Sequence, residues 1–125
     1  MYTNRDLRIL VDLAGTWRME NGWQIIIRAE WVDQSPGRPH GLSYALILQN
    51  EDEKRLLGFD NSHLADDAAE SDLWDHEHRA DAVGRTFAYK FKSVSQLLKD
   101  FFERCGSYCK SQGVKFDVCD VEISS

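Results

Sequence analysis

Three of the four histidines in this chain lie in one short polar region, beside aspartates and an arginine. The most regular part of that region is the segment Asp75-His76-Glu77-His78-Arg79. In an extended strand, His76 and His78 would point to one side of the backbone and the other three side chains to the opposite side. Two imidazoles about 7 Å apart can hold one phosphate, share a metal ion, or act as general acid and general base. The segment therefore predicts proton-transfer chemistry, of the kind that phosphodiester cleavage without a metal requires.

Other polar residues near the histidine pair could complete such a site. Asp60 ends an apolar segment, and we expect Asp60 and Asp75 to orient the imidazoles through their carboxylates. Arg79 could hold a phosphate with two parallel hydrogen bonds if the local backbone turns its guanidinium inward. The supporting residues of this candidate site are Asn61, His63 and Trp74.

The same residues allow two other interpretations. A His-x-His pair on a strand edge is often solvated surface, and Asp60-Asn61 at a strand end can form a turn. In that case the histidine-rich edge would be a non-catalytic binding surface for a protein partner. A metal-dependent enzyme that uses Asp60, Asp75 and the histidine pair is a weaker hypothesis, because strand-borne histidines with loop carboxylates make a poor metal site. We therefore expect neither a metal nor a cofactor.

Length, composition and charge predict a single cytoplasmic domain over residues 1–125. The apolar fraction of 42% is typical of a globular protein, and no apolar run reaches the roughly 18 residues that a membrane-spanning helix needs. The first residues carry charges where a signal peptide would be hydrophobic. The net charge of −6 argues against a surface that grips nucleic acid all over, although a local basic site is compatible with it. Three cysteines without a framework spacing favour reduced thiols, and Cys105 and Cys109 fall on an apolar helix face.

Hydrophobic periodicity predicts an α+β fold, with an antiparallel, meander-like sheet of about five to six strands. One long C-terminal amphipathic helix packs on this sheet, and a short N-terminal helix precedes it. The Asn21-Gly22 dipeptide marks the first hairpin, and Ser93 with Gln96 is expected to form a helix-capping box. The predicted helices cover residues 3–13 and 94–109, and the predicted strands cover residues 16–20, 23–32, 42–50, 55–60, 85–91 and 114–123.

From Arg55 onward, the order of features resembles the TumE-type toxin family of prokaryotic toxin–antitoxin modules. The family-like region extends over residues 20–105. The N-terminal helix, the last predicted strand and the long loop before Asp75 depart from the family pattern. The motifs that carry the resemblance are Phe59-Asp60-Asn61, Asp75-His76-Glu77-His78, Tyr89-Lys90-Phe91 and Leu97-Leu98-Lys99-Asp100-Phe101.

This resemblance implies a small toxin that is neutralised by an antitoxin of the helix-turn-helix class. Because many toxins of such modules are ribonucleases, it also implies RNA as the target. His76 and His78 would then supply the acid and the base, and Arg79 would hold the phosphate. The oligomeric state is left open, a homodimer included, and no membrane partner is implied.

Overall fold

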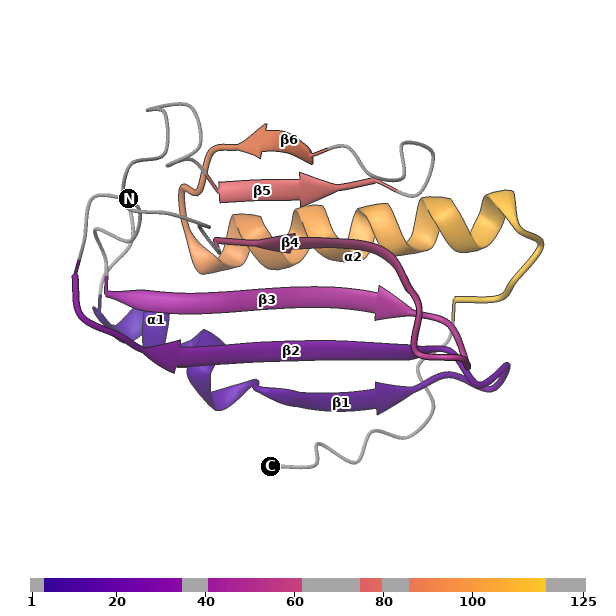
Figure 1. Ribbon diagram of the computed structural model, residues 1–125, viewed down its shortest axis with the longest axis horizontal. Helices are drawn as coiled ribbons and strands as arrows, with labels where there is room; N and C mark the ends of the chain where they lie inside the picture. The colour runs from indigo at the N-terminus through magenta and orange to yellow at the C-terminus, as the bar shows by residue number, and fades with distance from the viewer. Residues whose placement is uncertain (1–3, 35–40, 62–74, 80–85, 117–125) are drawn as a thin grey trace.

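Six strands form one antiparallel sheet in which every strand pairs with its neighbour in the sequence, from β1 to β6 (Figure 1). The computed structural model describes residues 4–34, 41–61, 75–79 and 86–116. The helices are α1 (Asn4–Asp12) and α2 (Val94–Ser111). The strands are β1 (Gly15–Arg18), β2 (Gln24–Trp31), β3 (Leu42–Gln49), β4 (Arg55–Asp60), β5 (Asp75–His78) and β6 (Thr86–Tyr89). The predicted α+β meander with a short N-terminal helix and a long C-terminal helix is confirmed.

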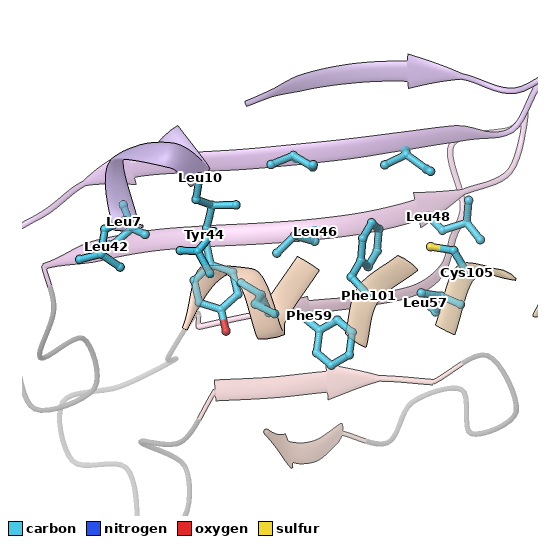
Figure 2. Close-up of a cluster of buried hydrophobic side chains, with 14 of the residues drawn as sticks. Leu7, Leu10, Leu42, Tyr44, Leu46, Leu48, Leu57, Phe59, Phe101 and Cys105 are labelled. Atoms are coloured by element: carbon cyan, nitrogen blue, oxygen red, sulfur yellow. The ribbon is translucent and has the colours of Figure 1, made fainter. Parts of the chain in front are cut away.

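The hydrophobic core lies between one face of the sheet and the two helices (Figure 2). Side chains alternate along a strand, so β3 turns every second residue toward the helices. Those residues are Leu42, Tyr44, Leu46 and Leu48, which are buried as the sequence pattern predicts. Helix α2 packs on them through Val94, Leu97, Phe101, Cys105 and Cys109, and α1 adds Leu7 and Leu10. Among the described residues, neither helix is both long and apolar enough to cross a membrane.

Cys105 and Cys109 belong to this core, as their place on the apolar helix face predicts. Both thiols are reduced and buried, and they lie about one helical turn apart on α2. Burial raises the pKa of each thiol, and the neighbouring Cys109 raises that of Cys105 further. Both side chains therefore pack as small apolar groups and are poor nucleophiles.

One hydroxyl group and one carboxylate group fix the start of α2. The Ser93 hydroxyl accepts a hydrogen bond from the Gln96 backbone N–H at 3.1 Å, which is one half of the predicted capping box. The Gln96 side chain donates instead to Asp100 Oδ1 at 2.8 Å. The Val94 N–H donates to Asp6 Oδ2 of α1 at 2.9 Å. Because helix N-termini favour negative charge, Asp6 joins the two helices where α2 begins.

The first hairpin turns at Asn21-Gly22, as predicted, through a loop of Glu20, Asn21 and Gly22. The Met19 N–H donates to the Trp23 carbonyl at 2.8 Å, so these two residues close the loop. Gly22 has a φ of +92°, which a side chain would strain, and the Asn21 side chain accepts from the Trp23 N–H. A three-residue loop with glycine in the left-handed region is a common hairpin connection.

The predicted last strand, residues 114–123, is not found where the structure describes the chain. Residues 114–116 follow α2 without joining the sheet, and residues 117–123 lie outside the described residues. Gly113, with a φ of +69°, ends the helix, and the Val114 N–H donates back to the Cys109 carbonyl at 2.8 Å. Phe116 then packs against Phe102 of α2 instead of pairing with a strand.

Neither helix covers the other face of the sheet, which we call the helix-free face. Strand pairing aligns residues into rows that cross the sheet, and the members of one row point to the same face. One row on the helix-free face crosses β2 to β6 through Arg28, Ala45, Asp60, His76 and Ala88. The next row consists of Ile26, Ile47, Gly58, His78 and Thr86.

Candidate active site

Asp60, His76 and His78 form one cluster on the helix-free face, which we call the Asp60 cluster. Asp60 lies directly opposite His76 in the pairing of β4 with β5. Its Oδ2 is 2.8 Å from His78 Nε2, and its Oδ1 is 3.5 Å from His76 Nδ1. One carboxylate therefore contacts both imidazoles. The three side chains are 13–20% exposed, so the cluster is largely shielded but still reached by solvent.

Small residues surround the Asp60 cluster on its own face. Ala45 lies opposite Asp60 on β3, and Ala88 lies opposite His76 on β6. Gly58 is the partner of His78 on β4. None of these three residues carries more than one side-chain carbon, so these neighbours of the cluster within its rows are all small.

Arg55 brings a positive charge to the cluster through an irregularity in β4. The pairing of β3 with β4 shifts between Leu48 and Gln49, so that Gln49 pairs with Arg55 while Leu48 pairs with Leu57. The extra residue, Leu56, puts Arg55 on the same face as Asp60 although the two are an odd number of positions apart. Arg55 Nη1 is 4.0 Å from Asp60 Oδ2, and the Arg55 side chain is 46% exposed. Arg55 is not among the site residues that the sequence predicts.

Asp75 and Arg79 lie on the other face, which the helices cover. Asp75 is buried and accepts a hydrogen bond from the Tyr44 hydroxyl at 2.5 Å. Burial and the Asp75 carboxylate together raise the pKa of Tyr44. Arg79 Nε is 3.3 Å from Glu77 Oε2, and its guanidinium stacks 3.9 Å above the Phe87 ring. The structure therefore does not bring Asp75 or Arg79 to the imidazoles, and the roles expected for them there gain no support from their positions.

Glu77 connects the site strand to helix α2. It is 4% exposed, and its Oε2 accepts a hydrogen bond from Arg104 Nε at 2.8 Å. This bond with the Glu77 carboxylate raises the pKa of the Arg104 guanidinium. Arg79 and Arg104 both pair with the buried Glu77 carboxylate, so its charge is compensated. The ion pair holds β5 against α2, and β5 in turn carries the two histidines on its opposite side.

Asn61 supports the backbone beside Asp60. Its side chain is fully buried, accepts from the Tyr44 N–H at 2.9 Å and donates to the Leu42 carbonyl at 2.6 Å. These bonds extend the pairing of β3 with β4 past the end of β4. His63 and Trp74, the other two supporting residues, lie outside the described residues.

The chemistry available to the Asp60 cluster is proton transfer. A carboxylate next to an imidazole fixes the orientation of the ring and stabilises its protonated form. Two imidazoles on one face supply the two proton-transfer groups that paired acid and base catalysis needs. Within the described ranges, no group of three or more His, Cys, Asp or Glu side chains is arranged to hold a metal ion.

Gly58 is expected to tolerate no side chain, because a Cβ there would lie 2.6 Å from the Leu46 carbonyl oxygen. Gly58→Ala should lower the free energy of unfolding by about 1–3 kcal/mol, since the backbone of β3 or β4 must shift. The measurement is urea unfolding followed by circular dichroism.

The control is Gly106→Ala in α2, where the new Cβ would lie an ordinary 3.7 Å from Phe116. Alanine favours helix interiors, so this variant should be as stable as the wild type or up to about 1 kcal/mol more stable. Equal losses in the two variants would contradict the pairing of β3 with β4 described above.

A family model described as toxin TumE matches residues 15–108. The matched region begins at the first residue of β1, contains all six strands and extends into α2, so it includes the whole Asp60 cluster and Arg55. Helix α1 lies outside it. No curated protein and no solved structure matches the chain significantly. The family match covers most of the chain, confirms the resemblance drawn from its motifs, and shows that the chain belongs to the TumE family of toxins.

Proposed function

We propose that this TumE-family protein acts on RNA by metal-independent phosphodiester cleavage. The observation that carries the proposal is a single carboxylate, Asp60, which contacts two imidazoles on one face of the sheet. An arginine, Arg55, lies within 4.0 Å of the same carboxylate. These residues supply a base, an acid, a group that orients both and a cation for the phosphate.

The reaction would proceed by attack of the RNA's own 2′-hydroxyl. One imidazole, neutral, takes the proton of the 2′-hydroxyl while that oxygen bonds to the adjacent phosphorus. The other imidazole, protonated, gives its proton to the 5′-oxygen as the bond from phosphorus to that oxygen breaks. The products are a 2′,3′-cyclic phosphate on one fragment and a 5′-hydroxyl on the other.

The remaining charges of the cluster have defined parts in this scheme. Asp60 stabilises the imidazolium and holds each ring at a fixed orientation. Arg55, whose guanidinium is half-exposed, binds the non-bridging phosphate oxygens as negative charge develops on them. We assign structural roles to Asp75 and Arg79. On the helix-covered face, the Asp75 side chain contacts Tyr44 and the Arg79 side chain contacts Glu77.

The biological role that accompanies this activity is that of a cytoplasmic toxin held inactive by an antitoxin. Membership of the TumE family supports the toxin part of that role. We propose that the antitoxin is a helix-turn-helix protein encoded beside the toxin. Expression of the chain alone should then arrest bacterial growth, and co-expression with that neighbour should restore growth.

The direct test is cleavage of a labelled single-stranded RNA by the purified protein in excess EDTA. We expect cleavage to proceed at the same rate with and without the chelator, and the fragments to end in 2′,3′-cyclic phosphate and 5′-hydroxyl. Cleavage that EDTA abolishes, or products with 3′-hydroxyl ends, would refute the mechanism. The same RNA carrying 2′-O-methyl groups should not be cleaved, because the attacking oxygen is blocked.

A non-catalytic protein-binding surface is the competing function. The observation in its favour is that Asp60 already contacts a nitrogen of each imidazole and that all three side chains are mostly shielded. A binding surface would leave RNA intact in the assay above and would lose affinity for its protein partner in increments as the cluster residues are replaced.

A further inference from the structure

A hollow of about 660 Å³ lies on the helix-free face of β1, β2 and β3. Its walls include the side chains that strand pairing directs to that face, namely Thr16, Ile26, Arg28, Glu30, Ser43 and Ala45. Small residues on β1 and β3 face the longer side chains of β2. The hollow has the volume typical of ligand-binding clefts, which lie between about 300 and 1,000 Å³.

This hollow adjoins the Asp60 cluster. Ala45 lines the hollow and is also the cross-strand partner of Asp60, and Arg28 is the partner of Ala45 on the other side. Arg28, Ala45, Asp60 and His76 therefore occupy consecutive strands in one row. Neighbouring strands lie about 4.8 Å apart, so the backbones of Arg28 and His76 are separated by about 14 Å. A chain molecule bound at the imidazoles can continue along this row into the hollow.

The charge of this face suits a polyanion, although the chain as a whole has a net charge of −6. Strand pairing places Arg18, Arg28 and Arg55 on the helix-free face. The carboxylates of the same strands on that face are Asp60, which contacts both imidazoles, and Glu30. Glu30 lies one row further from the cluster, opposite Ser43.

Arg28 is the cation that lines the hollow. It is exposed, and in the part of the chain that the structure describes no hydrogen bond or ion pair engages its guanidinium. By contrast, Arg79 and Arg104 are both paired with Glu77 on the other face. An exposed arginine that has no protein partner and borders a hollow is well placed to bind an anion.

We propose that the hollow binds the stretch of single-stranded RNA next to the cleaved phosphodiester, with Arg28 holding a flanking phosphate. This inference rests on the proposed ribonuclease function and names the part of its substrate that lies outside the Asp60 cluster. Single-stranded RNA is the form that fits. In-line attack by a 2′-hydroxyl requires a backbone conformation that a flexible single strand can adopt and that the rigid A-form duplex does not allow. The contacts would be to phosphate and to the apolar side chain of Ile26, which predicts binding with weak sequence preference.

The test measures binding without cleavage. A fluorescent, single-stranded 2′-O-methyl oligonucleotide, which the proposed mechanism cannot cut, is titrated with the protein and followed by anisotropy at several salt concentrations. We expect Arg28→Ala to weaken binding about tenfold at low salt and to reduce the salt dependence by the contribution of about one phosphate contact. Arg28→Lys should recover part of the affinity. Arg8→Ala, which removes an exposed arginine from α1 on the opposite side of the sheet, should bind like the wild type.

A second variant tests the hollow independently of its charge. Ser43→Phe fills the hollow on a partly exposed position, and it should weaken oligonucleotide binding while leaving the unfolding midpoint nearly unchanged. Equal binding by wild type, Arg28→Ala and Ser43→Phe would overturn the inference. The inference would also be overturned if the two variants lost binding to a protein partner but still bound RNA like the wild type.

Failure of this inference can be told apart from failure of the proposed function. If the wild type cleaves RNA in a His76- and His78-dependent way but the hollow variants cleave and bind normally, the function stands and the RNA path is wrong. If the wild type neither binds the oligonucleotide nor cleaves RNA, both proposals fail.

Discussion

Replacing either His76 or His78 with alanine is expected to abolish growth arrest and to lower kcat/KM for RNA cleavage by about 10²–10⁴-fold. Each imidazole contacts the same carboxylate, and in the proposed mechanism each supplies one of the two proton transfers. Removing one should therefore stop the reaction nearly as completely as removing both. The double variant should be no worse than the poorer single variant, since residues that act as a unit are non-additive.

A loss of activity must be separated from a loss of structure, because the two histidine side chains are only 18–20% exposed. His78→Ala leaves Asp60 without its 2.8 Å partner, and we expect this to lower the free energy of unfolding by about 1–3 kcal/mol. His78→Gln is the better variant, since glutamine can still donate to Asp60 but cannot transfer a proton. An inactive His78→Gln protein with a wild-type circular dichroism spectrum would isolate the chemical role. Full toxicity in both alanine variants would remove the Asp60 cluster from consideration as the active site.

A pair of arginines provides the matched control. Arg55 and Arg79 have nearly equal side-chain exposure, 46% and 44%, and flank the same strand pair on opposite faces. Arg55→Ala should lower the cleavage rate, because it removes the cation beside Asp60. Arg79→Ala removes the same charge from the helix-covered face, so RNA cleavage should be close to that of the wild type. The reverse result would restore Arg79 to the phosphate-binding role that the sequence suggests.

Phe101→Ala is expected to cost about 3–5 kcal/mol of unfolding free energy, the usual loss when a fully buried phenylalanine is truncated. Phe101 is 0% exposed, and its ring packs edge-on against Phe59 of β4 at a centroid distance of 6.4 Å. The substitution leaves a cavity where α2 contacts the centre of the sheet. Because the total stability of a domain is about 5–15 kcal/mol, the variant should unfold at markedly lower urea concentration.

Two neighbours on α2 are the controls for this prediction. Phe102 is 38% exposed, so Phe102→Ala should lose about 1 kcal/mol even though the same atoms are removed. Lys99 is exposed, and Lys99→Ala should change stability by less than about 0.5 kcal/mol. Equal losses for Phe101→Ala and Phe102→Ala would mean that α2 packs on the sheet through a different face.

The sequence by itself determined most of the elements, the strand predicted over residues 114–123 excepted, and the side on which most of their residues lie. Alternation with a period of two identifies the inward residues of β3, and a period of 3.6 identifies the buried stripe of α2, because both depend only on local backbone geometry. The same alternation places His76 and His78 together and directs Asp75 and Arg79 away from them. Periodicity does not predict the exposure of every side chain. Phe102 lies next to the buried stripe of α2, and its position in the sequence does not reveal that solvent reaches it.

The tertiary structure decided which residues complete the site. Asp60 joins the imidazoles because β4 pairs with β5 in a register that places it opposite His76, and register is a property of two strands together. Arg55 reaches the cluster because one extra residue, Leu56, interrupts the alternation of β4 where it pairs with β3. On the other face, Asp75 accepts a hydrogen bond from Tyr44 of β3, a contact between residues far apart in the chain. Local periodicity carries no information on pairing register, bulges or such distant partners, and for that reason the place of Arg55 in the site could be read only from the folded chain.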